Sequence, residues 1–196
     1  MKIKRFAVGV FEANGYVIYQ ENGGDCYIID PGYAPEQFIT FIDKNELNVI
    51  GILLTHHHYD HVGGVSKIKA PKGCSVYMHR KDIEMYGAEV DVVMEDGDVI
   101  MLEGEEIKVL HTPGHTEGGV CLFSEKSKLV FTGDTIFNVD LGRTDLADGD
   151  PYKMLATMKN IVNTWGDEIM IYPGHGDPCD MKFVRRVNTE FLDAIH

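Results

Sequence analysis

Histidine and aspartate are concentrated in one short stretch of this chain, Thr55–His61, which has the order Thr-His-His-His-Tyr-Asp-His. His56 and His58 are two residues apart, so in an extended backbone their imidazoles point to the same side and could share one metal ion. Asp60 and His61 are adjacent, and a helical turn there would direct both at a second ion. Imidazole and carboxylate ligands suit Zn²⁺, Fe²⁺ or Mn²⁺, whereas Mg²⁺ and Ca²⁺ prefer oxygen ligands. The stretch therefore predicts a transition-metal site.

Three further candidate ligands each follow a short apolar run that is typical of a buried strand. They are His115 after Ile107–Leu110, Asp134 after Leu129–Phe131, and His175 after Ile169–Tyr172. A glycine precedes each of them and lets the backbone turn sharply toward a shared centre. The histidine-rich stretch likewise follows an apolar run, Val49–Leu54. Residues at the ends of several strands of one rigid sheet can meet. We therefore expect one site to contain His56, His58, Asp60, His61, His115, Asp134 and His175.

The elements that must position these residues begin with short strands. Apolar runs predict strands at Ile3–Val10, Tyr16–Tyr19, Cys26–Ile29, Val49–Leu54, Cys74–Met78, Val99–Leu102, Ile107–Leu110, Val120–Phe123, Leu129–Phe131 and Ile169–Tyr172. Turns are expected at Asn14–Gly15, at Asn22–Gly24 and at Ser124–Lys128.

Helices are expected at three places between and after these strands. Pro35 opens one helix, and Pro151, after the N-cap Asp150, opens another that continues at helical spacing to Trp165. A single last helix is expected over Phe183–Ile195. This order of elements indicates an α+β fold in which two mixed β-sheets carry helices on their outer faces.

Composition narrows the class of protein. The chain has 196 residues, and 18 basic against 31 acidic residues give a net charge of −13. Such an excess of carboxylates repels phosphate backbones and anionic lipid, so neither nucleic acid nor a membrane is an expected partner. No apolar stretch approaches the ~20 residues of a membrane span, and the first residues lack the apolar block of a signal peptide. We therefore expect a cytoplasmic protein with free, buried cysteines at Cys26, Cys74, Cys121 and Cys179.

Taken together, these motifs resemble those of the metallo-β-lactamase superfamily. The matching segments are Ile29–Gly32, Thr55–His61, Pro113–Thr116, Thr132–Asp134 and Pro173–Gly176. The resemblance implies a single domain, residues 1–196, folded as an αββα sandwich around a two-metal site. It implies ligand sets of His56, His58 and His115 for one ion, Asp60, His61 and His175 for the other, and Asp134 bridging both. Asp30 matches a carboxylate that supports the family's site from outside.

Within the superfamily the chain is most similar to the glyoxalase II group, the hydroxyacylglutathione hydrolases, in its short bacterial form. The resemblance implies hydrolysis of an acyl thioester such as an S-acylglutathione, with two divalent ions, zinc before iron or manganese. Two features depart from that group. Only 21 residues follow His175, so the helical domain that forms much of the glutathione pocket is not expected. Asp145 stands where a tyrosine is usual, so the thiol carrier and the acyl group stay open.

Arg143 keeps a basic position of the family's substrate loop and has two interpretations. Its guanidinium could bind a substrate carboxylate. It could equally pair with Asp145 or Asp148 as an ordinary loop residue.

The chemistry expected of such a centre is attack by a hydroxide held between two metal ions. Two ions ~3.5–4 Å apart lower the pKa of a bridging water toward neutrality, and they stabilise the oxyanion that forms at the carbonyl. A thiolate, whose pKa is about 8.5, leaves without a proton donor, whereas an amide nitrogen does not. On this interpretation Asp60 and Asp134 are the catalytic carboxylates.

Other functions stay open at this point. The Gly142–Asp145 segment also resembles persulfide dioxygenases, which use one iron, and the matching ligands would be His56, His115 and Asp134. Those enzymes usually carry Pro-Ala-His-Asp-Tyr where this chain has Pro173–Gly176, which favours the hydrolase. A lactone or ester hydrolase makes the same demands on the metals. A metal-binding protein without catalysis would need a segment that blocks the open coordination position, and the sequence indicates none.

The remaining histidines are expected to be structural or exposed. His57 should face away from the metals and help to position its loop, and Tyr59 should pack beside the site without binding metal. The same structural role is expected of His79, His111 and His196.

Overall fold

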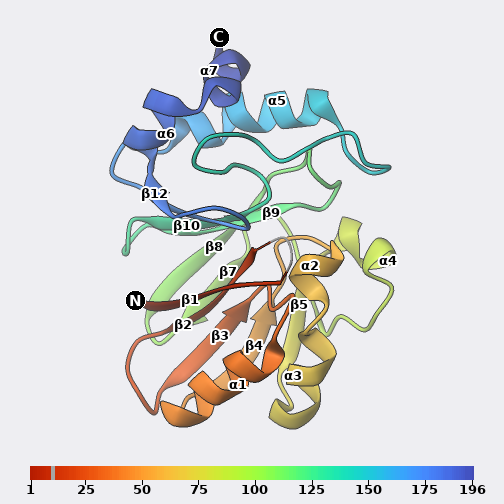
Figure 1. Cartoon of the computed structure of the whole chain (residues 1–196), viewed down its shortest axis with the longest axis vertical. Coiled ribbons are helices and arrows are strands. Elements are labelled where there is room, and N and C mark those ends of the chain that lie inside the picture. Colours follow the sequence, from red (N-terminus) through yellow and green to blue (C-terminus); the bar gives the residue numbers. More distant parts are fainter. Residues whose placement is uncertain (10–11) are drawn as a thin grey trace.

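Two six-stranded β-sheets lie face to face in the computed structural model, which describes residues 1–9 and 12–196 (Figure 1). The first sheet, in spatial order, contains β1 (Lys2–Val8), β2 (Ala13–Tyr19), β3 (Asp25–Ile29), β4 (Asn48–Leu53), β5 (Ser75–His79) and β6 (Val92–Met94). The second contains β12 (Cys179–Asp180), β11 (Met170–Pro173), β10 (Leu129–Gly133), β9 (Val120–Ser124), β8 (Glu105–His111) and β7 (Val99–Leu102). Both sheets mix parallel and antiparallel pairs, since β3 to β6 run parallel in the first and β10 and β11 in the second.

Helices cover the outer face of each sheet (Figure 1). The first sheet is covered by α1 (Pro35–Lys44), α2 (Tyr59–Val62), α3 (Val65–Lys72), the 3₁₀ turn η1 (Arg80–Asp82) and α4 (Ile83–Tyr86). The second sheet is covered by α5 (Pro151–Asn160), the 3₁₀ turn η2 (Val162–Thr164), α6 (Met181–Val187) and α7 (Thr189–Ile195). The predicted αββα sandwich is confirmed.

Three buried apolar layers hold the sandwich together, one between the sheets and one under each set of helices. Successive strand residues point to opposite faces. In β2, Val17 therefore packs under the helices and Ile18 packs between the sheets; Val130 and Phe131 divide in the same way in β10. Strands buried on both faces have continuous apolar sequences, which is why their positions could be predicted.

Every predicted strand is present, and all except Val99–Leu102 have slightly different ends. The last residue of the expected strand Ile3–Val10 lies outside the described residues. The turn predicted at Asn14–Gly15 is wrong, because both residues lie inside β2. A Cβ on Gly15 would stand 2.6 Å from the ring of Phe38 and from the carbonyl oxygen of Asp30, so the glycine allows a close approach within the strand.

The two C-terminal helix predictions are wrong at their ends. The helix expected to reach Trp165 ends at Asn160, after which η2 follows. The single last helix is two helices, α6 and α7, separated at Asn188. The fully buried Asn188 accepts a hydrogen bond from the amide of Phe191 at 2.9 Å and so caps α7. Its amide group also donates to the carbonyl oxygens of Phe137 and Asp140.

Two further expectations concern single features. The side chain of Asp150 accepts hydrogen bonds from the amides of Tyr152 and Lys153, which confirms it as the N-cap of α5. The four cysteines are free, and all except Cys179 are buried.

Among the described residues, no helix combines the length and the apolar character needed to span a membrane.

Candidate functional site

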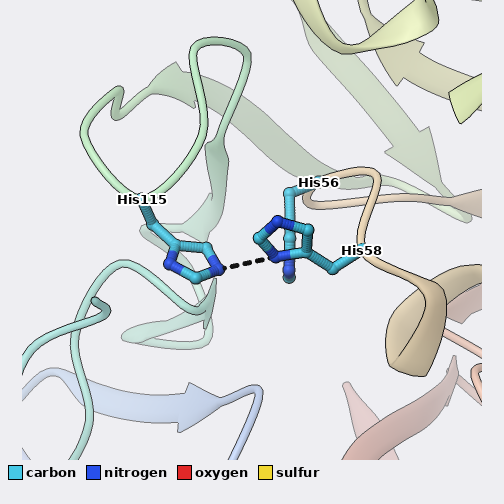
Figure 2. Close-up of side chains that lie close together, drawn as sticks. All are labelled: His56, His58 and His115. Carbon is cyan, nitrogen blue, oxygen red and sulfur yellow. Dashed lines mark hydrogen bonds between the residues drawn. The ribbon is translucent and has the colours of Figure 1, made fainter. Parts of the chain in front are cut away.

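Three histidines from two loops converge at one point between the ends of the sheets (Figure 2). His56 and His58 lie in the extended segment between β4 and α2, and His115 lies in the loop after β8. Each offers a ring nitrogen within 4.8 Å of the other two. The Nδ1 atom of His58 is 2.9 Å from Nε2 of His115. His56 and His58, two residues apart, therefore do reach the same point as His115.

A second group lies beside the first and contains Asp60, His61 and His175. Asp60 and His61 are on the short helix α2, and His175 follows β11. The Nε2 atom of His175 is 3.3 Å from Oδ2 of Asp60 and 3.4 Å from Nε2 of His61.

Asp134 lies between the two groups. Its Oδ2 atom is 3.5 Å from Nε2 of His115 and 3.5 Å from Nε2 of His175, and its Oδ1 atom is 3.3 Å from Nε2 of His61. The structure thus brings all seven predicted ligands together, although their role as ligands stays a prediction.

The donor set fits a metal centre. The Nε2 atom of His56 and the Oδ1 atom of Asp134 are buried and have no hydrogen-bond partner among the described residues. Buried polar atoms normally find a partner, and a cation would provide one for each. Burial, together with the neighbouring histidines, holds the pKa of His56 well below its usual value and lowers that of His58 to about 4. Both rings are therefore neutral at physiological pH, which is the form that binds metals.

In the group of Asp60, His61 and His175, the surroundings instead favour the charged forms of Asp60 and His61. Burial alone would lower the pKa of His61, but the carboxylates of Asp134 and Asp30 outweigh it and raise the pKa to about 9. Burial would raise the pKa of Asp60, but its hydrogen bond with His175 and the nearby charge of His61 together outweigh burial and lower the pKa to about 2. Three carboxylates around buried imidazoles thus favour a positive charge at this position.

Asp30 and Thr55 contact each other and two of the predicted ligands, His56 and His61. The two carboxylate oxygens of Asp30 accept hydrogen bonds from the amide and the hydroxyl of Thr55, at 2.8 Å and 2.6 Å, and Oδ2 is 3.3 Å from Nδ1 of His61. Because the Thr55 hydroxyl donates to Asp30, it can accept from Nδ1 of His56, which is 3.0 Å away. Such contacts would turn Nε2 of both histidines toward the metal site.

His115 is oriented by the backbone of the segment that carries Arg143. Its Nδ1 atom donates to the carbonyl oxygen of Arg143 at 2.8 Å, which leaves Nε2 as the acceptor that faces the site. The Arg143 side chain itself pairs with Asp145 through two hydrogen bonds of 2.7 Å and 2.8 Å. The structure contains the ion pair with Asp145, and binding of a substrate carboxylate by Arg143 stays a prediction.

The loop that carries His175 is held by residues that sequence reasoning missed. The fully buried side chain of Asn14 donates to the carbonyl oxygens of Pro173 and Gly176, at 2.9 Å and 2.7 Å. Arg5 also donates to the Gly176 carbonyl, and the Tyr16 hydroxyl donates to that of Pro173. The available signal was an amide side chain followed directly by the apolar residues of β2, where a buried polar group needs a partner.

His57 contacts Asp82, although its ring centroid is also 4.7 Å from that of His58, so its orientation away from the metals stays a prediction. Its amide and its Nδ1 atom both lie about 3 Å from the buried carboxylate of Asp82. Asp82 also accepts hydrogen bonds from the Thr116 hydroxyl and the Gly118 amide. One buried carboxylate therefore connects the histidine-rich stretch to the loop of His115.

Tyr59 and His79 are both predicted to lie near or outside the site without binding metal. Tyr59 is 71% exposed, contacts Tyr33 edge to face, and lies beside the site as predicted. His79 stacks on His111 with ring centroids 4.2 Å apart, a packing role outside the site.

A cavity of about 750 Å³ opens beside the clustered ligands. His58, Asp60, His115, Asp134 and His175 line its base. One wall belongs to the segment 137–146 and includes Phe137, Val139, Leu141 and Leu146. A small organic molecule could therefore reach the predicted metal ligands from one side.

Comparisons with known proteins agree with this geometry. A family model described as Metallo-beta-lactamase superfamily matches residues 8–175. An uncharacterised protein of Mycobacterium tuberculosis is 34% identical over 223 residues, covering 100% of this chain and 99% of the relative. The hydroxyacylglutathione hydrolase GloC of Haemophilus influenzae is 30% identical over 212 residues and covers 99% of both proteins. The crystal structure of TTHA1623 in a di-iron-bound form has a TM-score of 0.83 and 30% identity, covering 94% of this chain and 98% of that chain.

Proposed function

This chain belongs to the metallo-beta-lactamase superfamily, and on that premise we propose that it is a metal-dependent hydrolase that cleaves an acyl thioester with water. The observation that carries the proposal is the gathering of seven histidine and aspartate side chains beside one cavity, which five of them line. The similarity to a hydroxyacylglutathione hydrolase supports the thioester class.

The proposed ligand sets follow the two groups of side chains. His56, His58 and His115 would hold one divalent ion, and Asp60, His61 and His175 would hold the other. Asp134 would contact both ions, and Asp30 would support the site through His61. Zinc suits imidazole and carboxylate ligands, and the di-iron form of a relative makes iron the second choice. When bound, such ions supply the Lewis acidity that activates water and polarises a carbonyl group.

The chain's own residues would orient the reactants. Asp60, whose low pKa keeps it ionised, would accept a hydrogen bond from the attacking water, and Asp134 would act through its contact with both ions. Water adds to the carbonyl carbon, the carbon–sulfur bond breaks, and a carboxylic acid and a thiol are released. The thiolate needs no proton donor to leave. Hydrolysis of a thioester therefore requires no general acid among the residues around the cavity.

Metal analysis beside a substrate panel tests the proposal. We expect two transition-metal ions per chain and hydrolysis of S-lactoylglutathione or a simpler thioester. Asp134→Ala should lower the hydrolysis rate by about a thousandfold or more and reduce the metal content to one ion or fewer. Asp193→Ala removes an exposed carboxylate outside the site and serves as the matched control.

Three results would contradict the thioester hydrolase. One iron per chain, with oxygen consumption in the presence of glutathione persulfide, would indicate the dioxygenase. Hydrolysis of esters or lactones, with every thioester inert, would indicate the other hydrolase class. A metal-loaded chain that is inert toward the whole panel would leave only metal binding.

A further inference from the structure

Four of the seven residues of the segment 137–146 that line the cavity are apolar, and the other three are Asn138, Asp140 and Arg143. Phe137, Val139, Leu141 and Leu146 face the cavity from this one segment. Val139 is 51% exposed and Leu146 is 39% exposed, so both leave apolar surface that a bound molecule could cover. Covering apolar surface is favourable in proportion to its area. The wall therefore suits a hydrocarbon or another uncharged group.

The charged residues of the segment 137–146 do not favour the binding of an anion. Residues 137–146 contain Asp140, Arg143 and Asp145, which gives one positive and two negative charges. Arg143 is the only lysine or arginine among the described residues that line the cavity. Its Nε and Nη2 atoms donate to the two carboxylate oxygens of Asp145, at 2.7 Å and 2.8 Å, in the two-point geometry that a substrate carboxylate would need.

The charge of the whole molecule acts in the same direction. The net charge of −13, which becomes −9 when the two proposed divalent ions add four positive charges, repels an approaching anion over distances up to about a Debye length. Glutathione carries two carboxylates and one ammonium group, so its thioesters arrive with a net negative charge. An anionic carrier would have to displace Asp145 from Arg143 and then lie beside the displaced carboxylate.

We propose that the cavity selects acyl thioesters whose acyl group and thiol carrier are uncharged, and that Asp145 excludes anionic carriers by occupying Arg143. This inference rests on the proposed thioester hydrolysis. The reaction is the same hydrolysis, and only the preferred carrier differs.

The solvent exposure of Arg143 and Asp145 limits the carrier preference that their ion pair can produce. Arg143 is 62% exposed and Asp145 is 68% exposed, and pairs of this kind change an equilibrium by at most about fivefold. Together with the repulsion from the acidic surface, we expect a preference of about threefold to tenfold for the neutral carrier. The apolar wall adds a separate effect of about fourfold for each methylene group of the acyl chain that it covers.

Two thioesters with the same acyl group measure the carrier preference. S-butyryl-N-acetylcysteamine has a neutral carrier and S-butyrylglutathione has an anionic one. With the metal-loaded full chain, we expect a higher kcat/KM for the neutral compound. Asp145→Asn should raise the kcat/KM of the glutathione compound relative to the neutral one by up to about fivefold. The double variant Arg143→Gln with Asp145→Asn should cancel that gain, because the freed guanidinium is then absent.

Glu89→Gln is the matched control for net charge. Glu89 is an exposed carboxylate that pairs with Lys69 and does not line the cavity. The variant changes the net charge by the same single unit, so a purely global charge effect would appear in both variants. We expect the gain for the glutathione compound only in Asp145→Asn.

A binding measurement separates this inference from the proposed function. Calorimetry with the uncleavable thioethers S-butyl-N-acetylcysteamine and S-butylglutathione should show the same order of Kd. Faster hydrolysis or tighter binding of the glutathione compounds, unchanged in Asp145→Asn, overturns the inference while thioester hydrolysis stands. If neither thioester is cleaved, the proposed function fails, and the thioether affinities still decide whether the cavity prefers uncharged ligands.

Discussion

Thr55 and Asp30 contact the Nδ1 atoms of His56 and His61, and we expect these contacts to direct Nε2 of both rings toward the predicted metals. Thr55 donates its hydroxyl hydrogen to Asp30 and is placed to accept from Nδ1 of His56, while Asp30 is in contact with Nδ1 of His61. A histidine that gives its Nδ1 hydrogen to a fixed acceptor presents Nε2 as a ligand. Neither Thr55 nor Asp30 has to touch a metal to affect the affinity for it.

Replacing Thr55 by valine tests this expectation at the residue scale. Thr55→Val keeps the shape of the side chain but leaves Nδ1 of His56 without an acceptor and Asp30 without one donor. Loss of such supporting contacts typically weakens metal binding 10- to 100-fold, so we expect a decrease of about that size in a chelator competition titration. Thr40→Val is the control, because Thr40 only donates to the Glu36 carbonyl on the exposed face of α1. Equal affinity in the wild-type chain and Thr55→Val would contradict the role.

At the scale of elements, the strands of the first sheet hold a loop that belongs to the second. Asn14, at the start of β2, binds the carbonyl oxygens on both sides of His175, and Arg5 in β1 binds one of them. The loop after β11 therefore takes its shape from the opposite sheet. His175 can reach Asp60 and Asp134 because this contact fixes the backbone that carries it.

Asn14→Ala should therefore disturb one half of the metal centre. The Pro173 and Gly176 carbonyl oxygens would each lose one of two donors, since Tyr16 and Arg5 also bind them, and each loss costs about 0.5 to 1.5 kcal/mol in the free energy of unfolding. We expect the metal content to fall toward one ion per chain, since the group of His56, His58 and His115 does not depend on this loop. Elemental analysis and chemical denaturation measure the two effects.

Tyr16→Phe is the milder comparison for the same loop, because it removes only the hydroxyl that binds the Pro173 carbonyl. It should retain two ions with a reduced affinity for one of them. Full metal content and unchanged affinity in both variants would show that His175 is positioned without this contact.

At the scale of the whole molecule, a buried carboxylate connects the two sheets away from the site. Glu105 in β8 is 1% exposed and accepts hydrogen bonds from Ser124 at 2.6 Å, from Ser127, and from Gln20 at 2.8 Å. Gln20 follows β2 of the first sheet, so the contact spans the sandwich. Burial raises the pKa of Glu105, but these hydrogen bonds outweigh it and lower the pKa from 4.5 to about 2.

The depressed pKa predicts how stability depends on pH. A carboxylate whose pKa is lower in the folded than in the unfolded chain stabilises the fold above the unfolded pKa, and this contribution is lost as the pH falls toward the folded pKa. We expect Glu105→Gln to lower the free energy of unfolding by about 2 kcal/mol at pH 7. The difference from the wild-type chain should shrink below about pH 4.5 and vanish near pH 2.

Chemical denaturation at several pH values measures this difference, with Glu106→Gln as the control. Glu106 is the next residue of β8 and is exposed, so its substitution should change stability by less than about 0.5 kcal/mol at any pH. A Glu105→Gln difference that is constant between pH 7 and pH 3 would contradict the prediction.

Much of the fold was accessible from the sequence because the pattern is local. Strands buried on both faces are short apolar runs, and Asp150 followed by Pro151 marks a helix start. The errors occurred where a distant contact decides the backbone. Asn188 ends α6 because its side chain is needed for capping α7 and for binding the carbonyl oxygens of Phe137 and Asp140.

Sequence alone determined the candidate ligands and the layered fold, because spacing and apolar runs act through neighbouring residues. Only the tertiary structure decided the contacts between distant segments. It showed that Asn14 lies within a strand and holds the loop of His175, and that Arg143 is paired with Asp145. A side chain's partner depends on which surfaces the folded chain brings within about 3 Å of each other, and no local pattern contains that distance.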